Sequence, residues 1–65
     1  MKHRTPTEAE TRQAIIDLFD RRPADVALTI AKRWIAAWED ASRPSLALAM
    51  RDQAALITGR TIFTL

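Results

Sequence analysis

Three prolines divide the chain into helix-forming segments. Pro6, Pro23 and Pro44 each precede a run that is rich in Ala, Leu and Ile. Proline lacks the N–H group that a helix interior needs, and it pushes the preceding residue out of the α region. It is tolerated in the first turn of a helix, where the N–H has no partner. The prolines therefore predict helices over about residues 6–20, 23–40 and 44–58.

The residues at the predicted helix ends agree with this division. Thr5 is placed to cap the first helix, with Pro6 at the first helical position and Glu8 completing a capping box. The third helix begins after a cap at either Ser42 or Arg43. Gly59, the one glycine of the chain, follows the third helix and favours a left-handed C-terminal cap there.

We expect an all-α fold in a single domain that spans residues 1–65. Two architectures are compatible with the short connections: a small three-helix bundle, or a helical hairpin with a third helix added. Residues 59–65 form a short extended C-terminal tail in this reading. The tail either packs back on a helix or pairs as an edge strand with another copy of the chain.

The second predicted helix has an unusually wide apolar sector. On a helical wheel its polar residues occupy roughly a third of the circumference, whereas an ordinary surface helix shows an apolar stripe of only about 100°. A helix of this kind needs cover on two sides, so we expect it to be the central helix. Its apolar residues are Val26, Ala27, Leu28, Ile30, Ala31, Trp34, Ile35, Ala37, Trp38 and Ala41.

The size of the chain leaves little stability to spare. At 7.3 kDa, folding buries about 6,400 Å², of which about 60% is apolar, and this contributes about 95 kcal/mol. Ordering the 65 residues costs about the same at roughly 1.5 kcal/mol each. Because chains this small often gain the missing stability by oligomerising, we expect a homodimer or another protein partner.

Two tryptophans in the apolar sector favour an interaction surface. Trp34 and Trp38 are one helical turn apart, and a three-helix unit of this size encloses two indoles with difficulty. Tryptophan is also enriched among the residues that dominate binding energy. The candidate interface residues are Leu28, Trp34, Ile35, Trp38, Leu48, Ile62, Phe63 and Leu65.

The composition offers no catalytic, cofactor-binding or metal-binding constellation. There is no Cys and only one His and one Gly, which excludes disulfides, thiolate zinc sites and Gly-rich phosphate loops. His3 lies in a basic N-terminal stretch outside the predicted helices. We therefore predict no catalytic residue, no cofactor and no metal, and the protein is not expected to be an enzyme.

The basic residues are distributed along the whole chain. Ten Lys and Arg face eight Asp and Glu, for a net charge of +2. A nucleic-acid-binding domain more often shows a concentrated basic stripe, so nucleic acid is the second choice of partner. The possible phosphate contacts are Arg21, Arg22, Lys32, Arg33 and Arg43.

Targeting features are not evident. The chain has no apolar run of about 18 residues, so no membrane span is expected, and no apolar region follows the basic N-terminus. A cytoplasmic location is the expectation. Eight Arg against two Lys, with twelve Ala, are typical of a GC-rich bacterium or its phage.

These observations predict a function without identifying a partner. We expect a non-enzymatic protein–protein interaction module, a homodimeric bacterial or phage regulator or inhibitor that binds a larger protein. The first alternative is a dimeric nucleic-acid-binding regulator that uses the surface arginines. The second is a structural subunit of a larger assembly.

Overall fold

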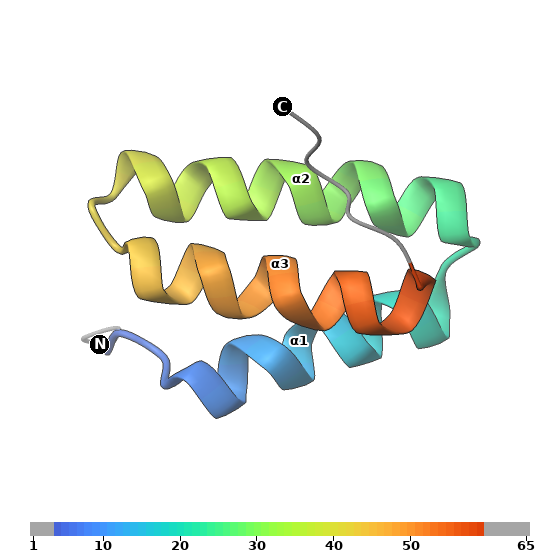
Figure 1. Cartoon of the computed structure of the whole chain (residues 1–65), viewed down its shortest axis with the longest axis horizontal. Helices are drawn as coiled ribbons and strands as arrows, with labels where there is room; N and C mark the ends of the chain where they lie inside the picture. Colours follow the sequence, from blue (N-terminus) through green and yellow to red (C-terminus); the bar gives the residue numbers. More distant parts are fainter. Residues whose placement is uncertain (1–3, 60–65) are drawn as a thin grey trace.

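The structure, a computed structural model, describes residues 4–59 and places three α-helices in them. These are α1 (Glu8–Arg21), α2 (Ala24–Asp40) and α3 (Pro44–Thr58). All three helices pack together, which confirms the all-α bundle (Figure 1). The predicted tail lies outside the described residues beyond Gly59.

The first helix begins two residues later than predicted, because its cap is Thr7 rather than Thr5. The Thr7 hydroxyl accepts a bond from the Glu10 N–H at 3.1 Å, and the Glu10 carboxylate accepts one from the Thr7 N–H at 2.8 Å. Arg4 adds a bond to the same carboxylate at 2.7 Å. Threonine three residues before glutamate occurs twice here, and the second occurrence forms the capping box.

The other helix ends follow the prolines and the glycine. Pro23 is the N-cap of α2, so this helix begins at Ala24, one residue after the predicted start. Pro44 occupies the first turn of α3, after an N-cap at Arg43. Gly59 ends α3 in the left-handed region with φ of 70°, and its N–H donates to the Ala55 carbonyl at 2.8 Å, as predicted.

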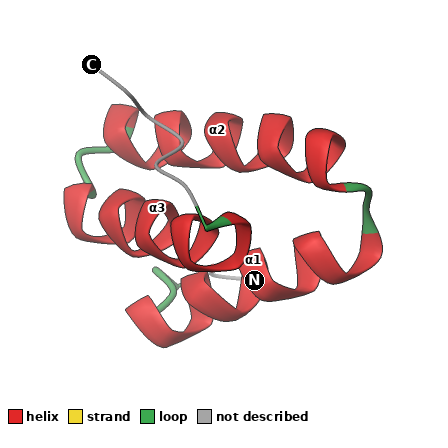
Figure 2. Ribbon diagram, turned by 45° about the vertical axis from the view of Figure 1, so that its right-hand side comes forward, coloured by secondary structure: helices red, strands yellow, loops and turns green. Residues whose placement is uncertain are grey.

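The central helix of the bundle is α3, so the expectation that α2 would be central is wrong. α3 packs along both other helices, whereas α1 and α2 meet over only a short stretch. In Figure 2, α1 and α2 meet at their connecting turn and diverge away from it, with α3 between them. Small buried residues explain the position of α3, because Ala47, Ala49 and Ala54 let two helices approach it closely.

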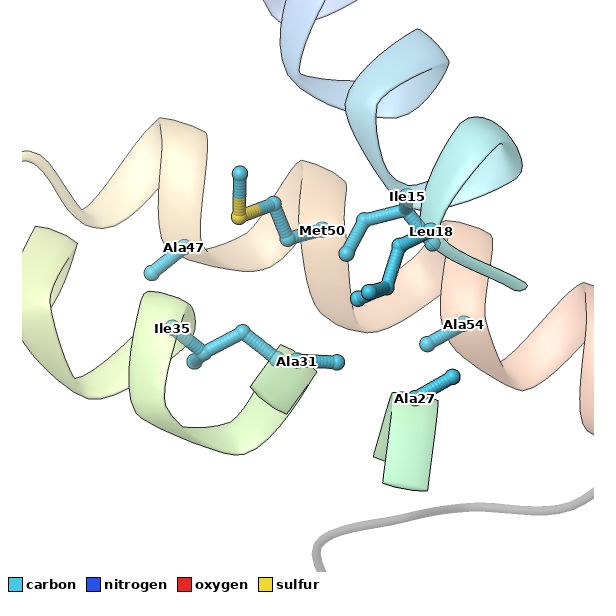
Figure 3. Close-up of a cluster of buried hydrophobic side chains, with 8 residues drawn as sticks. All are labelled: Ile15, Leu18, Ala27, Ala31, Ile35, Ala47, Met50 and Ala54. Atoms are coloured by element: carbon cyan, nitrogen blue, oxygen red, sulfur yellow. The ribbon is translucent and has the colours of Figure 1, made fainter. Parts of the chain in front are cut away.

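The core lies where α3 faces its two neighbours. Ala27, Ala31 and Ile35 of α2 form one continuous buried row, spaced by four residues. They meet side chains from α1 and α3 in one cluster (Figure 3). The cluster consists of Ile15, Leu18, Ala27, Ala31, Ile35, Ala47, Met50 and Ala54.

In the part of the chain that the structure describes, none of the helices is long and apolar enough to cross a membrane.

Candidate interaction surface

The position of α3 leaves one side of α2 without cover. Ala27, Ala31 and Ile35 are fully buried against α3, but the next residues around the helix face outwards. Val26 is 41% exposed and Trp34 is 37% exposed. Trp38 is half-buried and packs against the core cluster. The wide apolar sector of α2 is therefore only partly used within one chain.

This uncovered side opens into a hollow between α1 and α2. The hollow has a volume of about 350 Å³, and its lining is almost entirely apolar. Side chains from both helices form its walls, and α3 and the segment before α1 contribute one residue each. The lining residues are Pro6, Thr11, Ala14, Trp34, Ala37, Trp38 and Met50.

A second hollow of about 350 Å³ continues the first one towards the turn between α1 and α2. The two share Ala14 and Trp34, so the Trp34 indole lies at the junction between them. We call the pair the α1–α2 groove. Its second part is lined by Ala14, Asp17, Leu18, Arg21, Arg22, Ile30 and Trp34.

The groove has a basic end. Arg21 and Arg22 are both exposed at the end of α1, and within residues 4–59 neither is paired with a carboxylate. Asp17 lies beside them but accepts a hydrogen bond from the Gln13 amide at 3.1 Å. Two cationic groups are therefore available to a partner at this end.

The opposite end of α2 is acidic. Its last turn contains Glu39 and Asp40 and no basic residue. Glu39 accepts a bond from Arg51 of α3 at 3.2 Å, whereas Asp40 has no ion-pair partner among the described residues. A carboxylate at a helix C-terminus faces the negative end of the helix dipole. A cation supplied by another molecule would therefore stabilise this end of α2.

The structure separates the candidate interface residues into three groups. Trp34 and Trp38 both line the groove. The prediction that Ile35 belongs to an interface is wrong. Ile35 is 0% exposed and faces α3 within the core cluster. Leu28 packs against the core cluster and is half-buried, and Leu48 is 53% exposed on α3, away from the groove lining. Ile62, Phe63 and Leu65 lie outside the described residues.

The five possible phosphate contacts do not share one surface. Arg21 and Arg22 lie at the first turn, whereas Arg43 lies at the second turn, beyond the far end of α2. The 17 residues of α2 separate the two turns by about 25 Å. Lys32 and Arg33 are exposed in the middle of α2.

Several groove residues were not singled out as candidates from the sequence. Pro6, Ala14 and Met50 line the groove only because α1 and α2 diverge over α3. No local pattern indicates this divergence. Ile30 was recognisable as part of the wide apolar sector. That sector and the tryptophan pair Trp34 and Trp38 within it are the signals in the sequence that pointed to this surface.

The polar cluster at the start of α1 serves the fold. Within residues 4–59 there is no group of three side chains that could hold a metal ion. The hydrogen bond from the Thr7 N–H holds the pKa of Glu10 below its ordinary value, with a further contribution from Arg4. This lowered pKa therefore reflects the capping box of α1.

A comparison of the chain with protein-family models, curated proteins and solved structures finds no match in any of the three.

Proposed function

We propose that this protein is a non-enzymatic protein–protein interaction module that acts as a homodimeric regulator. The surface that carries the interaction is the α1–α2 groove, and its occupant is a second copy of the chain. The observation that supports this most directly is Trp34, which is 37% exposed at the middle of the groove.

An indole in this position favours association. Tryptophan buries 150–250 Å² when it is fully enclosed, and such residues are typical anchors of interfaces. Here the indole adjoins a hollow whose lining is almost entirely apolar. Covering both removes apolar surface from water at about 25 cal/mol per Å².

The charges of the same face favour a second copy over an unrelated protein. Arg21 and Arg22 line one end of the groove, and the acidic residues Glu39 and Asp40 lie at the opposite end of α2. A twofold axis perpendicular to α2 presents these unlike ends to each other, since each copy supplies the same surface. A small chain with little stability of its own also benefits from dimer formation.

The separation of the basic residues supports a protein partner more than nucleic acid. Arg43 and the pair Arg21 and Arg22 lie at opposite ends of α2. Phosphate binding along a duplex requires cations that follow one face. The groove offers instead an apolar surface with charged residues at one end, which is the usual composition of a protein contact.

Sedimentation equilibrium between about 1 µM and 1 mM tests the proposal directly. We expect a monomer–dimer equilibrium, and Trp34→Ala should raise the dimer dissociation constant about thirtyfold or more. Leu48→Ala is the matched control, because Leu48 is an exposed apolar residue outside the groove. A monomer throughout this range, or assembly beyond two copies, would contradict the proposal.

A further inference from the structure

We infer that the two copies pair with their α2 helices antiparallel, so that Arg22 of each copy meets the acidic end of α2 in the other. This inference rests on the proposed function, since it specifies how the same surface is used. It follows from the spacing of the apolar residues of α2 and from the charges at its two ends.

The apolar side of α2 forms a row at intervals of four residues. Val26, Ile30, Trp34 and Trp38 follow one another along the helix, and each lies about 40° further around it than the last. Val26 and Trp34 are exposed, and Ile30 and Trp38 are half-buried. The middle of this row is position 32, so a twofold axis that matches the row to itself passes there.

Antiparallel pairing about this axis places unlike sizes opposite each other. Val26 then lies opposite Trp38 of the second copy, and Ile30 lies opposite Trp34 of the second copy. Large residues facing smaller ones interdigitate, which is how close packing is achieved. Parallel pairing would instead place Trp34 against Trp34, with a weaker fit along the rest of the row.

The same register brings opposite charges together. Asp40 comes to lie opposite Ala24 of the second copy, and Arg22 precedes Ala24 by two residues. Asp40 and Ala24 of the second copy both lie about 12 Å from the axis along the helices and on the same side of it, so the guanidinium of Arg22 on the adjoining turn comes within reach of Asp40. Parallel pairing would place Asp40 beside Asp40 and Arg22 beside Arg22, and both contacts would be repulsive.

Arg22 of the second copy would also offset an unfavourable electrostatic feature of the single chain, at the C-terminal end of α2. The last turn of α2 has no basic residue, and Asp40 has no ion-pair partner among the described residues. A positive charge near the last carbonyl groups of a helix is favourable. Arg22 of the second copy supplies that charge from outside.

Charge reversal tests the orientation. We expect Arg22→Glu and Asp40→Arg each to raise the dimer dissociation constant about tenfold, and the double variant to restore it to near the original value. Lys32→Glu is the control, because it makes the same change of charge at an exposed position of α2 outside the groove lining. Circular dichroism checks that each variant keeps its helices.

Single cysteines give an independent test, since the natural chain has none. Arg33→Cys lies one residue from the proposed axis, so its two copies are about 3 Å apart along the helices, and a short bifunctional maleimide should link them. The two copies of Ala37→Cys should not be linked, because they would be about 15 Å apart along the helices. In a parallel pair, each of the two cysteines would instead lie close to the equivalent cysteine of the second copy.

The outcomes separate the two proposals. A dimer that forms normally in both single charge variants, or a double variant that stays weakened, overturns the antiparallel arrangement and leaves the proposed function standing. Cross-linking of Ala37→Cys as fast as Arg33→Cys also overturns it. A natural chain that stays monomeric at all concentrations overturns both.

Discussion

Trp34 and Ile35 are adjacent in the chain, yet Ile35 is fully buried and Trp34 is 37% exposed. A helix turns by about 100° per residue, and this one step takes the side chain from the α3 contact to the α1–α2 groove. The two positions therefore separate two contributions: Ile35 stabilises the bundle, and Trp34 belongs to the proposed dimer surface.

Truncating these two side chains should affect different quantities, the stability of the monomer in one case and the affinity of the dimer in the other. Ile35→Ala leaves a cavity in the core, so we expect the free energy of unfolding to fall by about 2–5 kcal/mol. Trp34→Ala removes a partly exposed side chain, and it should lower the stability of the monomer much less while weakening the dimer. Urea unfolding at low protein concentration measures the first effect apart from the second. Equal losses in both variants would contradict this division.

The difference between these residues also shows where inference from the sequence reaches its limit. Both belong to the wide apolar sector of α2, and that width indicates only how much surface needs cover. Which part is covered depends on where α3 lies. The row of small residues that lets α3 approach both neighbours, such as Ala47 and Ala54, has this effect only after the helices are packed.

Helix ends were predictable to the extent that a single residue determines them. Pro44 and Gly59 each permit one position at a helix end, and α3 has the predicted bounds. The start of α1 was ambiguous, because Thr5 and Thr7 each precede a glutamate by three residues. The divergence of α1 and α2, which forms the groove, has no local signal in the sequence.

The contact between α2 and α3 requires a side chain as small as that of alanine. Ala31 is 0% exposed, and Ala31→Leu would force extra atoms into a packed core, so we expect a loss of about 1–3 kcal/mol. Ala36→Leu makes the same change at an exposed position of α2 and should have little effect. Thermal unfolding of the two variants compares them. Equal melting temperatures would show that the contact is loosely packed.

The cap of α1 distinguishes two threonines. Thr7→Ala removes the hydroxyl that accepts from the Glu10 N–H, and it should cost about 1 kcal/mol of folding stability. Thr5→Ala is the control, since Thr5 makes no side-chain hydrogen bond with the other described residues. Denaturant unfolding measures both. A larger loss for Thr5→Ala would return the helix start to the earlier position.

The same cap should make stability depend on acidity. The Thr7 N–H bond holds the pKa of Glu10 below its ordinary value. At a pH between the folded-state pKa and the unfolded-state pKa, the folded chain therefore binds fewer protons than the unfolded chain. The contribution is complete above the unfolded-state pKa and is lost as pH falls through the folded-state pKa. Glu10→Gln should flatten this part of the curve of unfolding free energy against pH. An unchanged acid slope in Glu10→Gln would contradict it.

The proposed twofold axis passes close to Arg33, which gives the least expected of these predictions. In the antiparallel register Arg33 lies one residue from the axis, so the two guanidinium groups of a dimer lie near each other and repel. Arg33→Gln should therefore tighten the dimer, and the gain should be largest at low salt because screening weakens the repulsion. Lys32→Gln, which removes the same charge from the neighbouring position, should have less effect. Sedimentation equilibrium at two salt concentrations measures both variants. A weaker dimer in Arg33→Gln would place Arg33 away from the axis and require a different register.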